Sequence, residues 1–320
     1  MNAFRNILVV YDDSVGGDDA LGQAVELARG SGARMTIATV LREEQLAREA
    51  REETRKRLRR LAESVRHDGI DDVSVVLLAG TPYFQVIRQS IADDNDLVVV
   101  SAASGKSLRE KFFGSTATQL MRKCPCPVWV VKPGQRVPYS RIMAAVDPFA
   151  VNGSAGVASR ILDLATALSA RDDAVLSVVH AWEVDGSDLE TIRSETTEPL
   201  RRDILGRHRQ KRETGVNRLL AGYRMSEIAH NVHLPRESAP QAIRRIADEE
   251  AIDLIVMGTD GQRGLRPFLA GNTAEMVLAS VKCGVLTVKP DGFVSPVAVS
   301  DHPFECVAEV ELAAGGRRVA

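Results

Sequence analysis

A glycine-rich segment late in the chain has the residue types and spacing of an anion-binding loop. A short apolar run ends at Gly258, and Gly261 and Gly271-Asn272-Thr273 follow, which gives the spacing Gly-x2-Gly-x9-Gly-Asn-Thr. Glycines lack a Cβ, so backbone N–H groups can come close to a phosphate, and the unpaired N–H groups at a helix start favour negative charge. The pattern therefore predicts phosphate binding. The same glycines would equally serve only to turn a strand into a helix.

The spacing separates this loop from the two best-known nucleotide-binding motifs. It is neither a Walker A loop nor a Gly-x-Gly-x-x-Gly fingerprint, and no Walker A match occurs elsewhere in the chain. No lysine stands where a P-loop lysine would, so rapid ATP hydrolysis is not expected. Asp260 could act as a base or a Mg²⁺ ligand in a slow hydrolase, although a loop aspartate is more often a turn residue. We therefore assign no catalytic residue.

The elements that must position this loop follow a regular alternation. Apolar runs alternate with helical patterns, which is typical of a parallel α/β sheet, and Ile7-Leu-Val-Val10 is typical of a strand buried on both faces. Strands are expected at 6–11, 34–40, 72–78, 96–101, 126–133, 141–147, 175–181, 231–234, 254–258 and 285–288. Helices are expected at 18–31, 42–66, 83–92, 114–123, 153–169, 201–224 and 241–250, and one more from 271.

The second half of the chain repeats the first. A shift of 157 residues superposes the late segments without a gap, with these pairs: Asp96 and Asp253, Gly114 and Gly271, Cys126 and Cys283. The early segments need a shift of 135 residues, from Asp12 to Asp147, so the second copy carries extra residues, which we place at 184–199. Such a duplication predicts two tandem Rossmann-like domains, each an open five-stranded parallel sheet with helices on both faces. We expect the domains at 1–135 and 139–291, followed by a C-terminal tail at 292–320.

Composition excludes several classes of protein. The chain has 320 residues with 44% hydrophobic and 26% charged residues and a net charge of −2, which offers no general attraction to nucleic acid or to anionic membranes. No apolar run approaches the roughly 20 residues of a membrane helix, and the N-terminus has no signal-peptide pattern, so a cytoplasmic protein is expected. Cys124-Pro-Cys126 could be a metal or redox pair, but it has no second pair, and ordinary buried thiols are the interpretation adopted.

The duplicated unit and the glycine loop together resemble the universal stress protein family, and in particular its tandem two-domain members. Three phrases strengthen the resemblance, which covers nearly the whole chain up to about Pro290: Gly271-Asn-Thr-Ala-Glu275, Arg122-Lys-Cys-Pro-Cys-Pro-Val-Trp129 and Val288-Lys-Pro290. The resemblance implies a protein for survival under starvation, oxidative stress or DNA damage. It carries no reaction with it.

The resemblance also implies a nucleotide site in the second repeat. In nucleotide-binding members, an acid at the end of the first strand and a residue at the end of the second hold adenine and ribose, and the glycine loop and helix start hold the phosphates. The implied ligand is an adenine nucleotide, ATP with or without Mg²⁺. The positions carried over are Asp147, Ala181, Gly258, Gly261, Gly271, Asn272 and Thr273. Two departures are Pro148 after the acid and Asn272 where Ser or Thr is usual, although Asn can cap a helix and donate from its amide.

The first repeat keeps the outline of this site but not its glycines. The equivalent positions are Asp12, Val40, Ser101, Ser104, Gly114 and Ser115. A Cβ at Ser101 and Ser104 would crowd a phosphate, and serine adopts positive φ less readily than glycine. We therefore expect a degraded loop without nucleotide in the first repeat.

Three functions stay open at this point: a nucleotide-binding stress sensor, a slow ATP hydrolase, and a scaffold or binder of another small ligand. In this family the last strands commonly pair across a dimer, so 128–131 and 285–288 are expected to join the repeats as a pseudo-dimer, with a homodimer also open. No nucleic-acid or membrane partner is expected. No metal site is expected either, because His230 and His233 point to opposite faces of a strand, and His180 is expected to be structural or to line a pocket.

Overall fold

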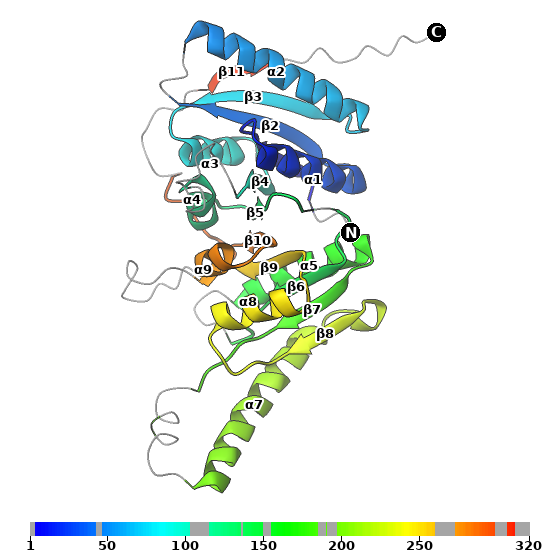
Figure 1. Cartoon of the computed structure of the whole chain (residues 1–320), viewed down its shortest axis with the longest axis vertical. Helices are drawn as coiled ribbons and strands as arrows, with labels where there is room; N and C mark the ends of the chain where they lie inside the picture. The colour runs from blue at the N-terminus through cyan, green and yellow to red at the C-terminus, as the bar shows by residue number, and fades with distance from the viewer. Residues whose placement is uncertain are drawn as a thin grey trace. The chain divides into compact units, whose positions relative to one another are not determined.

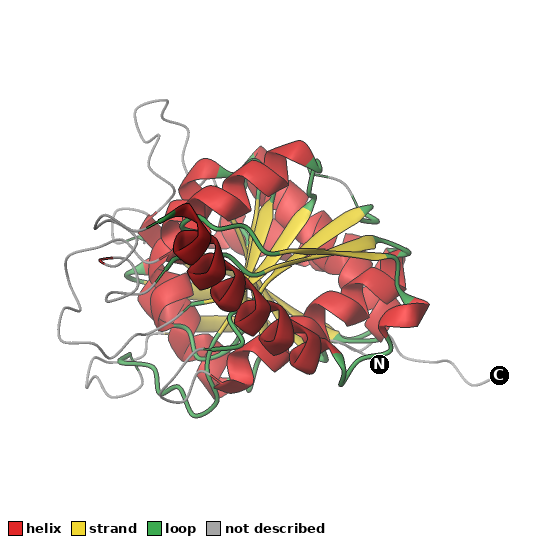
Figure 2. Cartoon of the chain, turned by 90° about the horizontal axis from the view of Figure 1, so that it is seen from below, coloured by secondary structure: helices red, strands yellow, loops and turns green. Residues whose placement is uncertain are grey.

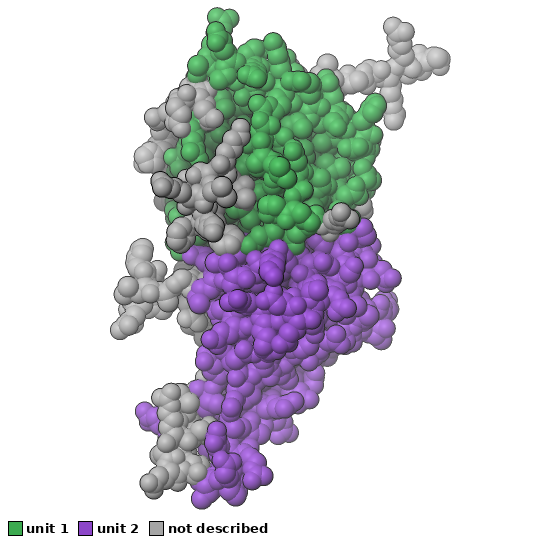
Figure 3. All heavy atoms as spheres, in the orientation of Figure 1, with its two compact units in different colours: residues 1–137, 293–320 green, residues 138–292 purple. Residues whose placement is uncertain are grey.

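Strands and helices alternate along the chain in the computed structural model (Figure 1), and helices lie on both faces of the strands (Figure 2). The structure describes residues 4–42, 47–102, 115–135, 137–149, 155–184, 190, 197–259, 273–297 and 306–310. The chain forms two compact units, one made of residues 1–137 with 293–320 and the other of residues 138–292 (Figure 3).

The first unit contains five parallel strands in the order β3-β2-β1-β4-β5. The strands are β1 (Asn6–Val10), β2 (Arg34–Leu41), β3 (Val73–Ala79), β4 (Leu97–Ser101) and β5 (Val128–Val131). Its helices are α1 (Val15–Ser31), α2 (Arg48–His67), α3 (Pro82–Ala92) and α4 (Ser115–Lys123). Every residue of β1 and β4 is buried, which explains why these strands are continuous apolar runs in the sequence.

The second unit repeats this order as β8-β7-β6-β9-β10, and all five strands are parallel. The strands are β6 (Arg141–Ala145), β7 (Val175–Val179), β8 (His230–His233), β9 (Leu254–Gly258) and β10 (Gly284–Val288). Its helices are α5 (Ala155–Asp172), α7 (Glu198–Leu220), α8 (Ala239–Glu249) and α9 (Thr273–Ser280), with a short 3-10 helix at Met225–Glu227. The predicted fold class of two tandem Rossmann-like units is confirmed. None of the helices in the described ranges is both long and apolar enough to cross a membrane.

An aspartate at the start of the fourth strand holds the start of the first strand in each unit. In the first unit, Asp96 accepts hydrogen bonds from the backbone N–H groups of Arg5 (2.8 Å) and Asn6 (2.9 Å). In the second unit, Asp253 accepts them from Ser140 (2.8 Å) and Arg141 (2.9 Å). The match of Asp96 with Asp253 in the sequence repeat therefore has a structural cause at the amino ends of the strands.

The C-terminal tail contributes a strand that was not predicted from the sequence. Strand β11 (Cys306–Val310) pairs antiparallel with the outer edge of β3, with Ala308 opposite Leu77 and Val310 opposite Val75. The expectation of a purely parallel five-stranded sheet was wrong for the first unit, which has a sixth, antiparallel strand. An edge strand has unpaired N–H and C=O groups, and a short extended segment satisfies them without any long sequence signature.

Removal of β11 should expose the edge of β3. A chain ending at residue 304 loses these backbone hydrogen bonds, each contributing about 1 kcal/mol, so amide exchange within Val73–Ala79 should become roughly tenfold faster or more. Hydrogen–deuterium exchange with mass spectrometry measures this. A chain ending at residue 310 is the matched control and should keep the protection of the full chain. Equal protection in both truncated chains would show that β11 does not cover β3.

Candidate functional site

Three neighbouring strand ends form the candidate site in the second unit. Ala145 of β6 is level with Val179 of β7 and with Met257 of β9. Two residues further along each chain lie Asp147, Ala181 and Thr259. The carboxyl ends of parallel strands meet at one edge of the sheet, on either side of the point where the strand order switches, which is where open α/β sheets bind ligands.

The predicted site residues divide into two groups. Asp147, Ala181 and Gly258 come from these adjacent strand ends, and Thr273 is the first residue of α9, the helix that follows β9. Gly261, Gly271 and Asn272 lie outside the described residues, as does Asp260. The structure thus brings together the strand-end residues of the predicted site, and their ligand-binding role stays a prediction.

Asp147 presents an accessible carboxylate at this edge. Its side chain is 55% exposed, and its Oδ1 accepts a hydrogen bond from the backbone N–H of Phe149 at 3.0 Å. This side-chain-to-backbone bond closes a tight turn directly after β6. The turn fixes one carboxylate oxygen while most of the group faces solvent, so Asp147 can accept hydrogen bonds from a ligand.

His180 lies beneath this turn and holds the backbone just before Asp147. It is 3% exposed, and its Nδ1 lies 3.1 Å from the carbonyl oxygen of Val146. A carbonyl only accepts hydrogen bonds, so Nδ1 carries the proton and Nε2 has a lone pair. Nε2 is buried and has no hydrogen-bond partner among the described residues. Burial lowers the pKa of His180, against the smaller opposing effects of the Val146 carbonyl and of Asp147. The imidazole is therefore held in its neutral form.

The first unit makes the same contact with a different residue. Thr39 Oγ1 donates to the carbonyl oxygen of Tyr11 at 2.9 Å, and Tyr11 precedes Asp12 as Val146 precedes Asp147. A donor from the end of the second strand therefore fixes the carbonyl before the acid in both repeats. The expectation that His180 is structural or pocket-lining gains a defined contact from this comparison.

Phe149 packs α7 against the edge of the sheet. Its ring centroid is 5.7 Å from that of His180. The guanidinium of Arg212, a residue of α7, lies 4.8 Å from the Phe149 ring centroid. A Cβ at Gly215 would collide with the Phe149 ring, so glycine in the middle of α7 allows this close approach. Phe149, Arg212 and Gly215 were not predicted from the sequence. The available signal was a glycine inside a helical pattern, which commonly has a packing reason.

Gly258 has a packing role that its sequence context did not distinguish from phosphate binding. A Cβ at this position would lie 2.8 Å from Val157 Cγ1 and 3.7 Å from Ile161 Cδ1, both on α5. Contacts under about 3 Å force the neighbouring atoms to move. The close approach of α5 to β9 therefore accounts for glycine here by itself.

Thr259 follows Gly258 and has a buried hydroxyl that is unpaired within the described ranges. Its backbone N–H donates to the carbonyl oxygen of Val288 at 3.0 Å, which continues the pairing of β9 with β10. Thr259 is 1% exposed, and its Oγ1 has no hydrogen-bond partner among the residues that the structure describes. A buried polar atom without a partner costs about 1–3 kcal/mol, so each such atom in a folded protein calls for an explanation. Thr259 was not predicted from the sequence, although it is the first polar residue after an apolar strand.

The equivalent acid in the first unit is used to start a helix. Asp12 Oδ1 accepts from Ser14 Oγ at 2.6 Å, and Ser14 Oγ in turn accepts from the N–H of Gly17 as the N-cap of α1. A Cβ at Gly17 would lie 2.5 Å from Asp12 Oδ1, so the start of α1 packs closely on this oxygen, while the residue as a whole is exposed. Ser101 is buried at the end of β4, Val40 is half-buried in β2, Ser115 begins α4, and Ser104 and Gly114 lie outside the described residues. The absence of nucleotide from the first repeat stays a prediction.

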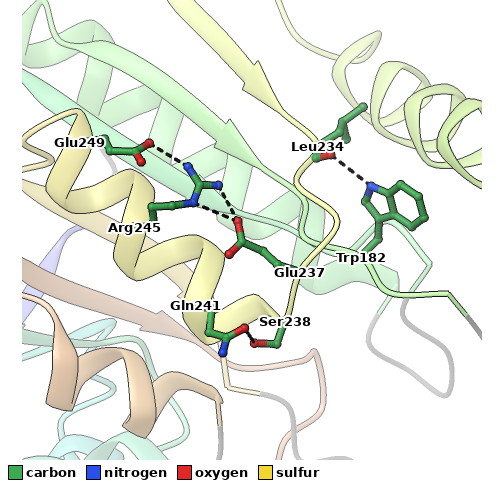
Figure 4. A network of polar contacts seen from close by, with 7 residues as sticks. All are labelled: Trp182, Leu234, Glu237, Ser238, Gln241, Arg245 and Glu249. Carbon is green, nitrogen blue, oxygen red and sulfur yellow. Dashed lines mark hydrogen bonds and ion pairs between the residues drawn. The ribbon is translucent and has the colours of Figure 1, made fainter.

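The polar side chains near β8 form ion pairs and hydrogen bonds with one another. His233 Nε2 lies 2.9 Å from Glu250 Oε1, and Glu250 Oε2 accepts from Ser177 Oγ. Figure 4 shows a second network, in which Arg245 joins two glutamates on and before α8, and Trp182 Nε1 donates to the carbonyl of Leu234 at 3.2 Å. Nowhere in the described ranges do three His, Cys, Asp or Glu side chains gather as metal ligands would.

Comparison with known proteins places the chain in a family. The profile described as Universal stress protein family matches residues 3–132 and 138–289, so the chain belongs to the universal stress protein family. Its tandem arrangement is like that of Universal stress protein E. The protein of that name from Photorhabdus laumondii subsp. laumondii is 26% identical over 318 residues, with 93% of this chain and 98% of the relative covered. The one from Escherichia coli (strain K12) is 24% identical over 322 residues, with 94% and 99% covered. The resemblance found in the sequence is confirmed.

Solved structures agree on the fold. A protein of unknown function from Pseudomonas aeruginosa PAO1 superposes with a TM-score of 0.69 at 25% identity, covering 91% of this chain and 94% of its own. A universal stress protein from Archaeoglobus fulgidus DSM 4304 superposes with a TM-score of 0.63 at 18% identity, covering 89% and 98%. Both matches extend over nearly the whole tandem arrangement.

The packing role of Gly258 predicts a loss of stability on substitution. Gly258→Ala should lower the free energy of unfolding by about 1–3 kcal/mol, because the new Cβ overlaps Val157. Chemical denaturation measures the change, and adding Val157→Ala should restore part of it. Gly206→Ala is the matched control, since Gly206 lies inside α7 and a Cβ added there would have nothing within 4 Å. That change should stabilise the protein by up to about 1 kcal/mol. Equal effects at both glycines would contradict the packing argument.

The buried imidazole predicts a loss of stability in mild acid. The pKa of His180 is lowered in the fold, so below about pH 6.5 the unfolded chain binds a proton that the native chain does not. The free energy of unfolding should fall as the pH drops from about 6.5 toward the lowered pKa. His180→Asn should flatten this part of the profile, because the side chain that binds a proton only in the unfolded chain is then absent. Parallel profiles for His180→Asn and the unmodified protein would show that His180 does not cause the loss of stability in mild acid.

Proposed function

We propose that this universal stress protein binds an adenine nucleotide at the carboxyl ends of β6, β7 and β9 in its second repeat. It would act as a cytoplasmic stress sensor or binding module rather than as an enzyme. Membership of the family supports the stress-response role. The observation that carries the nucleotide proposal is the presence, at neighbouring strand ends, of an exposed carboxylate, Asp147, and of a buried hydroxyl, Thr259 Oγ1, that has no hydrogen-bond partner in the described part of the chain.

The described residues fit the sugar end of a nucleotide. An exposed carboxylate at the end of a strand accepts hydrogen bonds from ribose hydroxyls. Asp147 keeps this capacity because only Oδ1 is bound by the Phe149 turn. The Thr259 hydroxyl lies at the start of the glycine loop and can donate to or accept from a ligand atom, which would remove the cost of its burial.

The phosphate end of the proposal depends on the sequence. Gly261, Gly271 and Asn272 stay predicted phosphate contacts, together with Thr273 at the start of α9, where the helix dipole favours an anion. Mg²⁺, when bound, would be held largely by the phosphates and water, as is usual for this ion. ATP, ADP and AMP share the ribose contacts and differ only at this end.

Binding would act on the protein by mass action. A ligand that binds only the native state, and whose free concentration is a hundred times its Kd, stabilises that state by about 2.7 kcal/mol. Nucleotide level would thereby shift the population of the form that a downstream partner recognises. The same proposal includes two modes of association, which stay predictions: the two repeats pair as a pseudo-dimer, and two chains pair as a homodimer.

The first test is chemical identification of a bound molecule. The full chain is purified without added nucleotide and denatured, and released small molecules are identified by mass spectrometry. We expect up to one adenine nucleotide per chain, and an empty preparation should bind added ATP in isothermal titration. Protein that releases none and binds none of ATP, ADP or AMP would overturn the proposal in favour of a scaffold or another ligand. Phosphate release well above background would make it a slow hydrolase.

Variants then assign the site to one repeat. Asp147→Asn keeps an oxygen for the Phe149 N–H but removes the charge, and charge-assisted hydrogen bonds contribute about 1.5–3 kcal/mol. The affinity for ATP should therefore fall roughly tenfold or more. Asp12→Asn, the matched change in the first repeat, should leave the affinity unchanged. Thr259→Val should weaken binding while leaving the melting temperature of the free protein equal or higher, because it removes an unpartnered hydroxyl. Weaker binding in Asp12→Asn alone would move the site to the first repeat.

A further inference from the structure

Two thiols in the first unit face each other at close range. Cys124 follows the end of α4, Cys126 lies just before β5, and Pro125 separates them in a bend of the backbone. Their Sγ atoms are 3.4 Å apart. Cys124 is fully buried, whereas Cys126 is half-buried. Ser90 Oγ of α3 lies 3.6 Å from Cys124 Sγ and packs against the pair from the neighbouring helix.

We propose that Cys124 and Cys126 form a site of oxidative modification, at which a low-molecular-weight disulfide converts the two thiols into an intramolecular disulfide. A disulfide bond is about 2.0 Å long, so the two sulfur atoms need to approach by little more than 1 Å. The bend at Pro125 and Cys126 already directs both side chains to the same side of the chain. This use of the first repeat is independent of the nucleotide site proposed for the second.

The reaction is a pair of thiol–disulfide exchanges. Cys126 is the more exposed sulfur, so its thiolate attacks one sulfur of the small disulfide, forms a mixed disulfide and releases one small thiol. Cys124 then gives its proton to solvent, attacks the sulfur of Cys126 and expels the second small thiol. Two protein thiols lose two electrons, and one small disulfide gains them and becomes two thiols. The atoms and electrons balance without any other reactant.

The surroundings of the pair set the expected rate. The contact with Cys124 and burial hold the pKa of Cys126 well above its usual range. The thiolate is the attacking form, so closure should be slow at neutral pH. As long as the pH is below that pKa, each unit of rising pH should accelerate closure by up to about tenfold. A site of this kind responds to sustained oxidation rather than to a brief pulse.

The second repeat offers an internal comparison. The repeat shift that places Cys126 on Cys283 places Cys124 on Val281. Cys283 therefore lacks a thiol partner two residues before it, and it is buried. Only the first repeat has the neighbouring thiol that closure requires.

The test follows one peptide of the native full-length protein. Trypsin releases residues 124–136, because Lys123 ends one peptide and Lys132 precedes proline, and this peptide contains both thiols and no other cysteine. The native protein is incubated with glutathione disulfide, then unfolded and alkylated, and the peptide is weighed. We expect it to lose two hydrogen atoms and to take up no alkyl group. A reductant should restore two alkylatable thiols.

Variants give the matched controls. Cys283→Ser should close the 124–126 disulfide as the unmodified protein does, whereas Cys126→Ser should give a peptide with one alkylated thiol. Both thiols of the unmodified protein still alkylated after oxidation, a glutathione adduct that persists on Cys126, or a crosslink between chains would each overturn the proposal. The result on the unmodified protein decides the matter even if a variant fails to fold.

Discussion

The pairing of β6 with strands on both of its sides is the constraint on which the candidate site depends. β6 is parallel to β7 and to β9 in a register that places Ala145 level with Val179 and Met257. Asp253 fixes the amino end of β6 through two backbone N–H groups, so the strand cannot slide without losing both bonds. The same register determines which residues emerge together at the carboxyl ends. A shift by one residue would remove Asp147 from the level of Thr259.

Much of the fold could be predicted from the sequence because its signals are local and repeated. Buried parallel strands are continuous apolar runs, and two copies of the same order support each other. β11 could not be predicted, because five residues pairing with a distant edge have neither a period nor a turn of their own. The start of α7 also differed. Helix α7 begins at Glu198 with Pro199 in its first turn, a position that proline favours, whereas the sequence pattern predicted a start at 201.

The candidate site could be predicted only in part, for a related reason. Asp147 follows a strand directly, so its location is determined by sequence order alone. Phe149 and Arg212 are 63 positions apart in the sequence and meet only because Gly215 lets α7 approach. Thr259 is recognisable only once its hydroxyl is seen to be buried without a partner. Contacts made across elements, and polar atoms left unsatisfied, are properties of packing that a single sequence does not record.

The two repeats show how one backbone arrangement supports different chemistry. Each fixes the carbonyl before its acid from the end of the second strand, with Thr39 in one and His180 in the other. Both acids are exposed, but in the first repeat Asp12 Oδ1 accepts from Ser14, the N-cap of α1, whereas in the second Asp147 Oδ1 accepts from the backbone N–H of Phe149. The glycine at the end of β9, Gly258, is explained by the approach of α5 and so contributes little to the case for a nucleotide. That case depends instead on the exposed carboxylate of Asp147 and the unsatisfied hydroxyl of Thr259. Packing against α5 explains neither of these, because an exposed acid fills no core and a buried hydroxyl without a partner opposes folding.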